Sequence, residues 1–154
     1  MESISIFDML KIGVGPSSSH TLGPWRAAMR FMDELSVVHD VCSISRIDVN
    51  LYGSLSLTGA GHATDIAVVM GLRGCDPTSY PVENIGADID EIKSSEKLKL
   101  SDGHTIDFYW EENICFNKNF LPFHPNGMIF SAFIGGDVIT ETFYSIGGGF
   151  VVQE

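Results

Sequence analysis

The nine residues from Gly13 to Thr21 read Gly-Val-Gly-Pro-Ser-Ser-Ser-His-Thr and stand directly before a segment with helical periodicity. A glycine followed by a proline indicates a turn, and serines are favoured at the N-terminal caps of helices. Downstream, apolar residues recur every three to four positions, as on the buried face of a helix: Leu22, Trp25, Met29, Met32 and Leu35. The pattern predicts a first helix from about residue 18 to residue 38, with Pro24 tolerated in its first turn.

This helix start is the first candidate binding site. Backbone N–H groups point outward from a helix N-terminus and the helix dipole is positive there, so a carboxylate or phosphate is stabilised. The hydroxyls and the imidazole that would line the site belong to Ser17, Ser18, Ser19, His20 and Thr21. An ordinary serine-rich cap with a bystander histidine is the alternative that the local pattern leaves open.

The rest of the chain predicts an α+β fold. Residues 44–52 alternate as a strand, residues 53–61 form a glycine-rich loop, and residues 62–72 and 82–94 have helical patterns. The second half is β-rich: a hairpin over 97–110, an irregular segment over 111–119, and strands over 128–134 and 138–146. Residues 4–12 are an apolar strand or helix. We therefore expect one domain over residues 1–154, a two-layer α/β sandwich with a mixed sheet and the order α-β-α followed by several strands.

Composition excludes several function classes. The net charge of −11 argues against nucleic-acid binding, because phosphate contacts need clustered Lys and Arg. No apolar run approaches the ~18 residues of a membrane span, and no basic region precedes a hydrophobic stretch at the N-terminus. These features predict a cytoplasmic protein without a membrane partner. The three cysteines, Cys42, Cys75 and Cys115, are far apart and lack Cys-x-x-Cys spacing, which predicts free thiols and no iron–sulfur cluster on this chain.

Two further groups are candidates for chemistry. His62 and Asp65 lie three residues apart on a predicted helix, so they share a face and could form a base and its orienting carboxylate. The alternative is a histidine at a helix start with an acid placed for the dipole. His124 and Asn126 lie in a Pro- and Gly-containing turn and could together hold a substrate carboxylate and amine, although Asn-Gly alone is also a hairpin signal. A zinc site built from the loop histidines is disfavoured, because no His-x-x-x-His or Cys–His spacing supports it.

Four blocks of sequence resemble, in order, the N-terminal (beta) domain of the iron–sulfur-dependent L-serine dehydratases, also called L-serine ammonia-lyases. The first block runs from Ser5 to Pro24 and contains the Ser-Ser-Ser-His-Thr motif. The others are Leu51–Leu55 with Gly59–Asp65, His124–Gly127, and the Phe143–Phe150 block with three consecutive glycines. Together the blocks span nearly the whole chain. The three glycines do not match a nucleotide-binding fingerprint and are expected to permit a bend or a close backbone approach.

The resemblance implies a lyase of amino-acid catabolism and gluconeogenesis that converts L-serine to pyruvate and ammonia. It implies a [4Fe–4S] cluster in a separate alpha domain, whose iron acts as Lewis acid on the serine hydroxyl, and a homo-oligomeric complete enzyme. This chain would then be a stand-alone beta subunit or a fragment, inactive in isolation, that closes over the cluster domain. Its catalytic residues would be His62, Asp65 and His124, with His62 favoured as the base, and Ser17–Thr21 and Asn126 would bind substrate. The alternative is a regulatory module that binds serine or an anion, similar to a domain found in some D-3-phosphoglycerate dehydrogenases.

Overall fold

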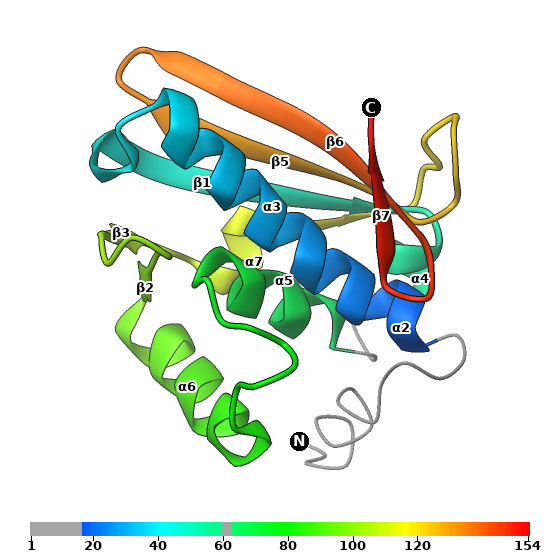
Figure 1. The fold of residues 1–154 in the computed structure, drawn as a ribbon, viewed down its shortest axis with the longest axis horizontal. Coiled ribbons are helices and arrows are strands. Elements are labelled where there is room, and N and C mark those ends of the chain that lie inside the picture. The colour runs from blue at the N-terminus through cyan, green and yellow to red at the C-terminus, as the bar shows by residue number, and fades with distance from the viewer. Residues whose placement is uncertain (1–16, 60–62) are drawn as a thin grey trace.

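The computed structural model describes residues 17–59 and 63–154 (Figure 1). The helices are α2 (Ser17–His20), α3 (Leu22–Val38), the 3₁₀ helix η1 (Val41–Ser43), α4 (Ser54–Gly59), α5 (Thr64–Leu72), α6 (Val82–Ser95) and α7 (Trp110–Asn113). The strands are β1 (Ile44–Tyr52), β2 (Lys97–Lys99), β3 (Thr105–Asp107), β4 (Ile114–Asn117), β5 (Gly127–Ile134), β6 (Asp137–Gly147) and β7 (Phe150–Gln153). The predicted segment over residues 4–12 lies outside the described residues.

The main sheet has five strands in the order β4-β1-β5-β6-β7. β1 and β4 pair in parallel and every other neighbouring pair is antiparallel, so the sheet is mixed. Helices α3 and α5 pack together on one side of it, while α6 and the two-stranded sheet β2–β3 flank this layer (Figure 1). The predicted α+β class, the mixed sheet and the α-β-α order are confirmed.

The core lies between the sheet and α3. Residues of β1 that alternate along the strand, Ile47, Val49 and Leu51, are fully buried, as expected for a strand with one covered face. The ring of Phe31 in α3 stacks on Phe130 of β5 with centroids 5.2 Å apart. Removing a ring of this kind from a packed core costs about 3–5 kcal/mol. This packing holds the long helix across the sheet and so fixes where its N-terminal end lies.

Pro24 explains why the first predicted helix is interrupted. A continuous helix would require residue 24 to donate an N–H to the carbonyl of His20, but proline has no N–H and its ring clashes with that carbonyl. The chain therefore breaks at Thr21, the first bond of α3 runs from the Trp25 N–H to the Thr21 carbonyl, and Ser17–His20 form the separate helix α2. The serines were expected to cap the long helix, but the residue at its N-cap is Thr21, which makes no side-chain capping bond.

Four other elements differ from the sequence prediction. The predicted loop over residues 53–61 contains the short helix α4, the irregular segment over 111–119 contains α7 and β4, and β7 was not anticipated. β4 and β7 are each four residues long, and each is defined by pairing with a strand elsewhere in the sheet rather than by its own periodicity. Within the described residues, no helix is long and apolar enough to cross a membrane.

Candidate functional site

Segments distant in sequence meet at one end of the main sheet. The register pairs Tyr52 with Asn117 and Gly127 with Tyr144, and β6 turns into β7 at Gly147–Gly149. Helices α2 and α4, the loop from Lys118 to Asn126 and the β6–β7 turn therefore gather at the same end of the domain, on the right in Figure 1. We call this region the loop end. His20 and His124 share it, whereas the third candidate histidine, His62, lies outside the described residues.

The end of α2 is fastened to the start of α5. The hydroxyl of Thr64 donates a hydrogen bond to the His20 carbonyl at 2.6 Å, and Ser19 Oγ lies 3.0 Å from His20 Nδ1. Ser19 and His20 are half-buried and Thr21 is buried. Ser17 and Ser18 lie in helix α2. The predicted serine-rich binding segment is thus a short, anchored helix beside the start of α5.

Asp65 follows Thr64 in the first turn of α5, and its carboxylate accepts two hydrogen bonds. Its Oδ1 accepts the N–H of Ile66 at 2.9 Å, and its Oδ2 accepts the indole N–H of Trp110 at 3.1 Å. Burial raises the pKa of the Asp65 carboxyl, although the Trp110 bond and the Lys93 ammonium counteract the shift. Lys93 of α6 lies 4.7 Å from the centre of the Trp110 ring. The role of Asp65 as an orienting group for His62 stays a prediction.

The His124–Asn126 turn has a defined imidazole orientation. The backbone N–H of Asn126 donates to His124 Nδ1 at 3.1 Å, so the hydrogen of the neutral imidazole lies on Nε2. Asn126 itself is buried and bonded to β6: its side-chain amide donates to the Ser145 carbonyl at 3.1 Å, and the Ser145 N–H donates to the Asn126 carbonyl at 3.0 Å. His124 can therefore offer an N–H to a ligand, while one amide hydrogen of Asn126 already holds the turn in place.

Sequence reasoning missed Trp110 and Ser145. Trp110 is 45 residues from the carboxylate that it contacts, and no local pattern indicates that pair. Ser145 is fully buried, and its Oγ has no hydrogen-bond partner in the part of the chain that the structure describes. The one available signal was its position two residues before the three glycines.

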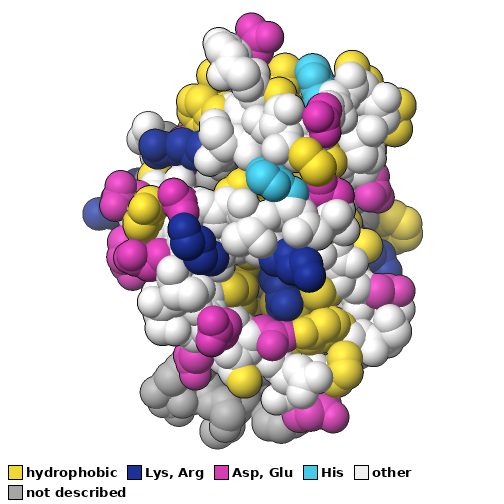
Figure 2. Space-filling view, turned by 90° about the vertical axis from the view of Figure 1, so that its left-hand side faces the viewer, with side chains coloured by type: hydrophobic (Ala, Val, Ile, Leu, Met, Phe, Trp, Pro, Cys, Tyr) yellow, Lys and Arg dark blue, Asp and Glu magenta, His cyan; other side chains and the backbone are white. Residues whose placement is uncertain are grey.

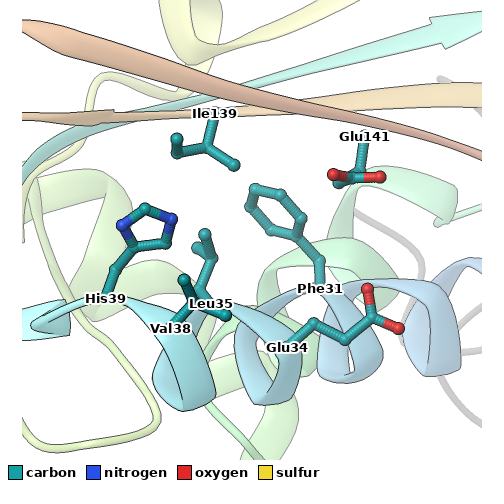
Figure 3. Close-up of a pocket in the computed structure, with 7 residues that line it drawn as sticks. All are labelled: Phe31, Glu34, Leu35, Val38, His39, Ile139 and Glu141. Carbon is teal, nitrogen blue, oxygen red and sulfur yellow. The ribbon is translucent and has the colours of Figure 1, made fainter.

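A cavity of about 200 Å³ lies elsewhere, between α3 and β6. Phe31 and Leu35 project into it from α3 and Ile139 from β6, and Glu34 and Glu141 lie at its edge (Figure 3). The side chain of Gln153 donates to both glutamates at 2.9 Å. None of the residues that line this cavity is a candidate from the sequence.

The described residues do not fit a metal cluster. Cys42, Cys75 and Cys115 are free thiols on η1, on the segment after α5 and on β4. Burial raises the pKa of the Cys75 thiol, away from the thiolate form that binds iron. Among residues 17–59 and 63–154, no three His, Cys, Asp or Glu side chains come together as metal ligands. A [4Fe–4S] cluster would have to be held by other residues.

Comparison with known proteins assigns the family. The profile described as serine dehydratase beta chain matches residues 5–154. The chain belongs to this family. It is 46% identical over 153 residues to L-serine dehydratase 1 and 47% identical over 153 residues to L-serine dehydratase TdcG, both from Escherichia coli K12. It is 44% identical over 154 residues to the L-serine dehydratase of Haemophilus influenzae.

These alignments cover 98% of this beta chain but 34% of each relative. The chain therefore spans about a third of the length of the curated relatives it matches. The resemblance inferred from the sequence blocks is confirmed at the level of the family.

Proposed function

We propose that this chain is the beta part of an L-serine dehydratase that deaminates L-serine to pyruvate and ammonia in the cytoplasm. The observation that supports this most directly is the family match over residues 5–154. The named relatives are L-serine dehydratases, and their similarity to this chain is spread over 98% of its length.

We further propose that the enzyme depends on a [4Fe–4S] cluster bound by a separate alpha domain. The cysteines of this chain are dispersed, and about two thirds of each relative lies outside the matched region, which leaves room for such a domain. The beta part would supply polar groups that bind and orient serine.

The reaction needs a proton acceptor near Cα and groups that hold the serine carboxylate. Removal of the α-proton and loss of the hydroxyl as water give aminoacrylate, which tautomerises and hydrolyses to pyruvate and ammonia. The Nε2–H of His124 and the hydroxyl- and imidazole-bearing segment around His20 suit a carboxylate, because they can offer it polar hydrogens. His62, three residues before Asp65 in the sequence, is the proposed base.

Single-histidine variants of the complete enzyme test this proposal. His62→Asn is expected to reduce kcat by roughly 10²–10⁴-fold, the usual contribution of a general base. His124→Asn is expected to raise KM for serine. His39→Asn, on a histidine at the C-terminal end of α3, is the matched control and should leave both constants unchanged. Unchanged turnover in His62→Asn, with loss only of activation by serine, would support the regulatory alternative instead.

A further inference from the structure

The four segments that make up the loop end carry no acidic residue, and the nearby Glu154 carboxylate accepts a hydrogen bond from the Tyr144 hydroxyl. These segments, residues 17–22, 52–59, 116–127 and 145–152, include no Asp or Glu and only one basic residue other than histidine, Lys118. The sequence as a whole has 20 acidic residues and a net charge of −11, so these segments depart from its average composition. At the opposite end, acidic and basic side chains are interspersed (Figure 2).

The same end exposes large apolar side chains. Leu57 is 60% exposed, Phe120 57%, Phe123 64% and Phe150 69%. With Phe116 and Ile146, these are six of the ten large hydrophobic side chains exposed in the described part of the chain. Exposed aromatic residues combined with a depletion of charge are typical of the buried centre of a protein interface.

These side chains are presented on a fixed backbone. Gly53 donates its N–H to the Asn119 carbonyl at 2.8 Å, and Ser54 donates to the Pro125 carbonyl at 2.9 Å. A Cβ at Gly53 would lie 2.3 Å from the Pro125 oxygen and 2.8 Å from the Phe120 ring, so the loop and the start of α4 are in direct contact. The Phe123 ring packs on Tyr144 with centroids 4.9 Å apart. A surface ordered in this way loses little conformational entropy on binding.

We propose that the loop end is the surface on which the remaining two thirds of a serine dehydratase docks. This inference rests on the proposed function. The candidate ligand-binding groups His20 and His124 lie within this end, so a domain seated on the surrounding apolar side chains would enclose them and exclude water. Because these segments carry no Asp or Glu, they would place no like charge beside the carboxylate of a bound serine. A second copy of this chain would duplicate these groups rather than add the metal ligands that the described residues lack.

Hydroxyl-radical footprinting with mass spectrometry tests the docking surface without a variant. Oxidation rates of Leu57, Phe120, Phe123 and Phe150 are measured in this chain alone and in the complete enzyme. We expect these rates to fall about tenfold or more in the complete enzyme. The reference side chains Val37, Val38 and Tyr109, which are exposed elsewhere, should change less than twofold. Equal rates at the loop end in both samples, or equal protection of the references, would overturn the proposal.

A matched pair of variants separates docking from folding. In the complete enzyme, Phe123→Asp should restore oxidation of Leu57 and Phe120, whereas Val138→Asp, at the other end of β6, should not. Circular dichroism of both variant chains should match the parent. Sedimentation of the chain alone as a dimer that Phe123→Asp dissociates, with its loop end already protected, would assign the surface to a second copy and overturn the proposal. A protected loop end in an enzyme that does not turn over serine would contradict the proposed function only.

Discussion

The side chain of Thr64 reaches across 44 positions of sequence to bond the backbone carbonyl of His20 at 2.6 Å. The Thr64 hydroxyl takes the place of the backbone N–H that Pro24 lacks. The bond also joins two of the segments that contain the family's sequence blocks. Thr64 is fully buried, so water cannot replace its hydroxyl.

Thr64→Val should destabilise the domain. The variant keeps the shape of the side chain but leaves a part-buried carbonyl without this donor, which costs about 1–3 kcal/mol. Urea denaturation followed by circular dichroism measures the change. Thr105→Val, on the exposed edge of β3, is the control and should stay within about 0.5 kcal/mol. Equal stability of Thr64→Val and the parent would show that the His20 carbonyl finds another donor.

Asp65→Asn should change how stability depends on pH. Burial raises the folded-state pKa of Asp65 above its unfolded value, so the folded chain binds its proton more tightly. The stability that comes from this proton is fully present below the ordinary carboxyl pKa of about 4 and is lost as the pH rises through the folded value. The neutral amide lacks this dependence, so the variant should gain stability relative to the parent between acidic and neutral pH. Parallel stability curves from pH 3 to pH 8 would contradict the expectation.

Gly149→Ala should be poorly tolerated in the β6–β7 turn. Gly149 has φ of 79°, and a Cβ there would lie 2.7 Å from Leu22 Cδ2 and 2.8 Å from Arg26 Nη1. The Arg26 guanidinium also donates to the Gly149 carbonyl at 3.3 Å. An alanine held at this positive φ is strained by about 1–3 kcal/mol. Thermal melting would detect the lower stability of the variant. Gly136→Ala is a close control in another hairpin, because a Cβ there meets nothing within 4 Å.

Ser145→Ala should be neutral or stabilising in this chain. The fully buried Ser145 hydroxyl makes no hydrogen bond in the described structure, and such a group costs about 1–3 kcal/mol. Thermal melting of the variant should therefore give a midpoint equal to or above that of the parent. A midpoint several degrees lower would mean that the hydroxyl has a partner in solution.

The isolated chain should bind no iron–sulfur cluster. Its three cysteines lie on separate elements and cannot form a common ligand set. Anaerobic reconstitution followed by iron and sulfide analysis should return only background metal. About four irons per chain with a brown chromophore would refute this expectation.

Local sequence patterns predicted the strands and helices whose apolar residues recur at a regular spacing. The bounds of β1, Ile44–Tyr52, match the alternating segment, and α5 and α6 each lie within about two residues of their expected ends. The break at Thr21 could have been derived from the spacing of Pro24, four residues after His20. β4 and β7 could not, because each depends on a partner strand distant in the sequence.

The candidate site was predictable as a list of residues but not as an arrangement. Glycine-, proline- and serine-rich blocks pointed to His20, at the end of α2, and to His124, in the loop before β5. The contacts that hold other candidate residues come from groups with no local signature: the indole of Trp110 bonds Asp65, and the Ser145 carbonyl accepts from the Asn126 side chain. Long-range pairing determines these contacts, so a single sequence does not reveal them.

The position of β1 in the sheet has a consequence for biosynthesis. β1 is made early, yet its partners β5 and β4 begin at residues 127 and 114. The ribosome must therefore add more than sixty residues before β1 can pair with either neighbouring strand. Non-local pairing of this kind is slow, and the unpaired apolar strand is prone to aggregate. In the meantime, only the helices that emerge before and shortly after β1 are available to shield it. Slower translation across residues 53–113 should then lower the soluble yield, whereas a chaperone that binds extended apolar segments should raise it.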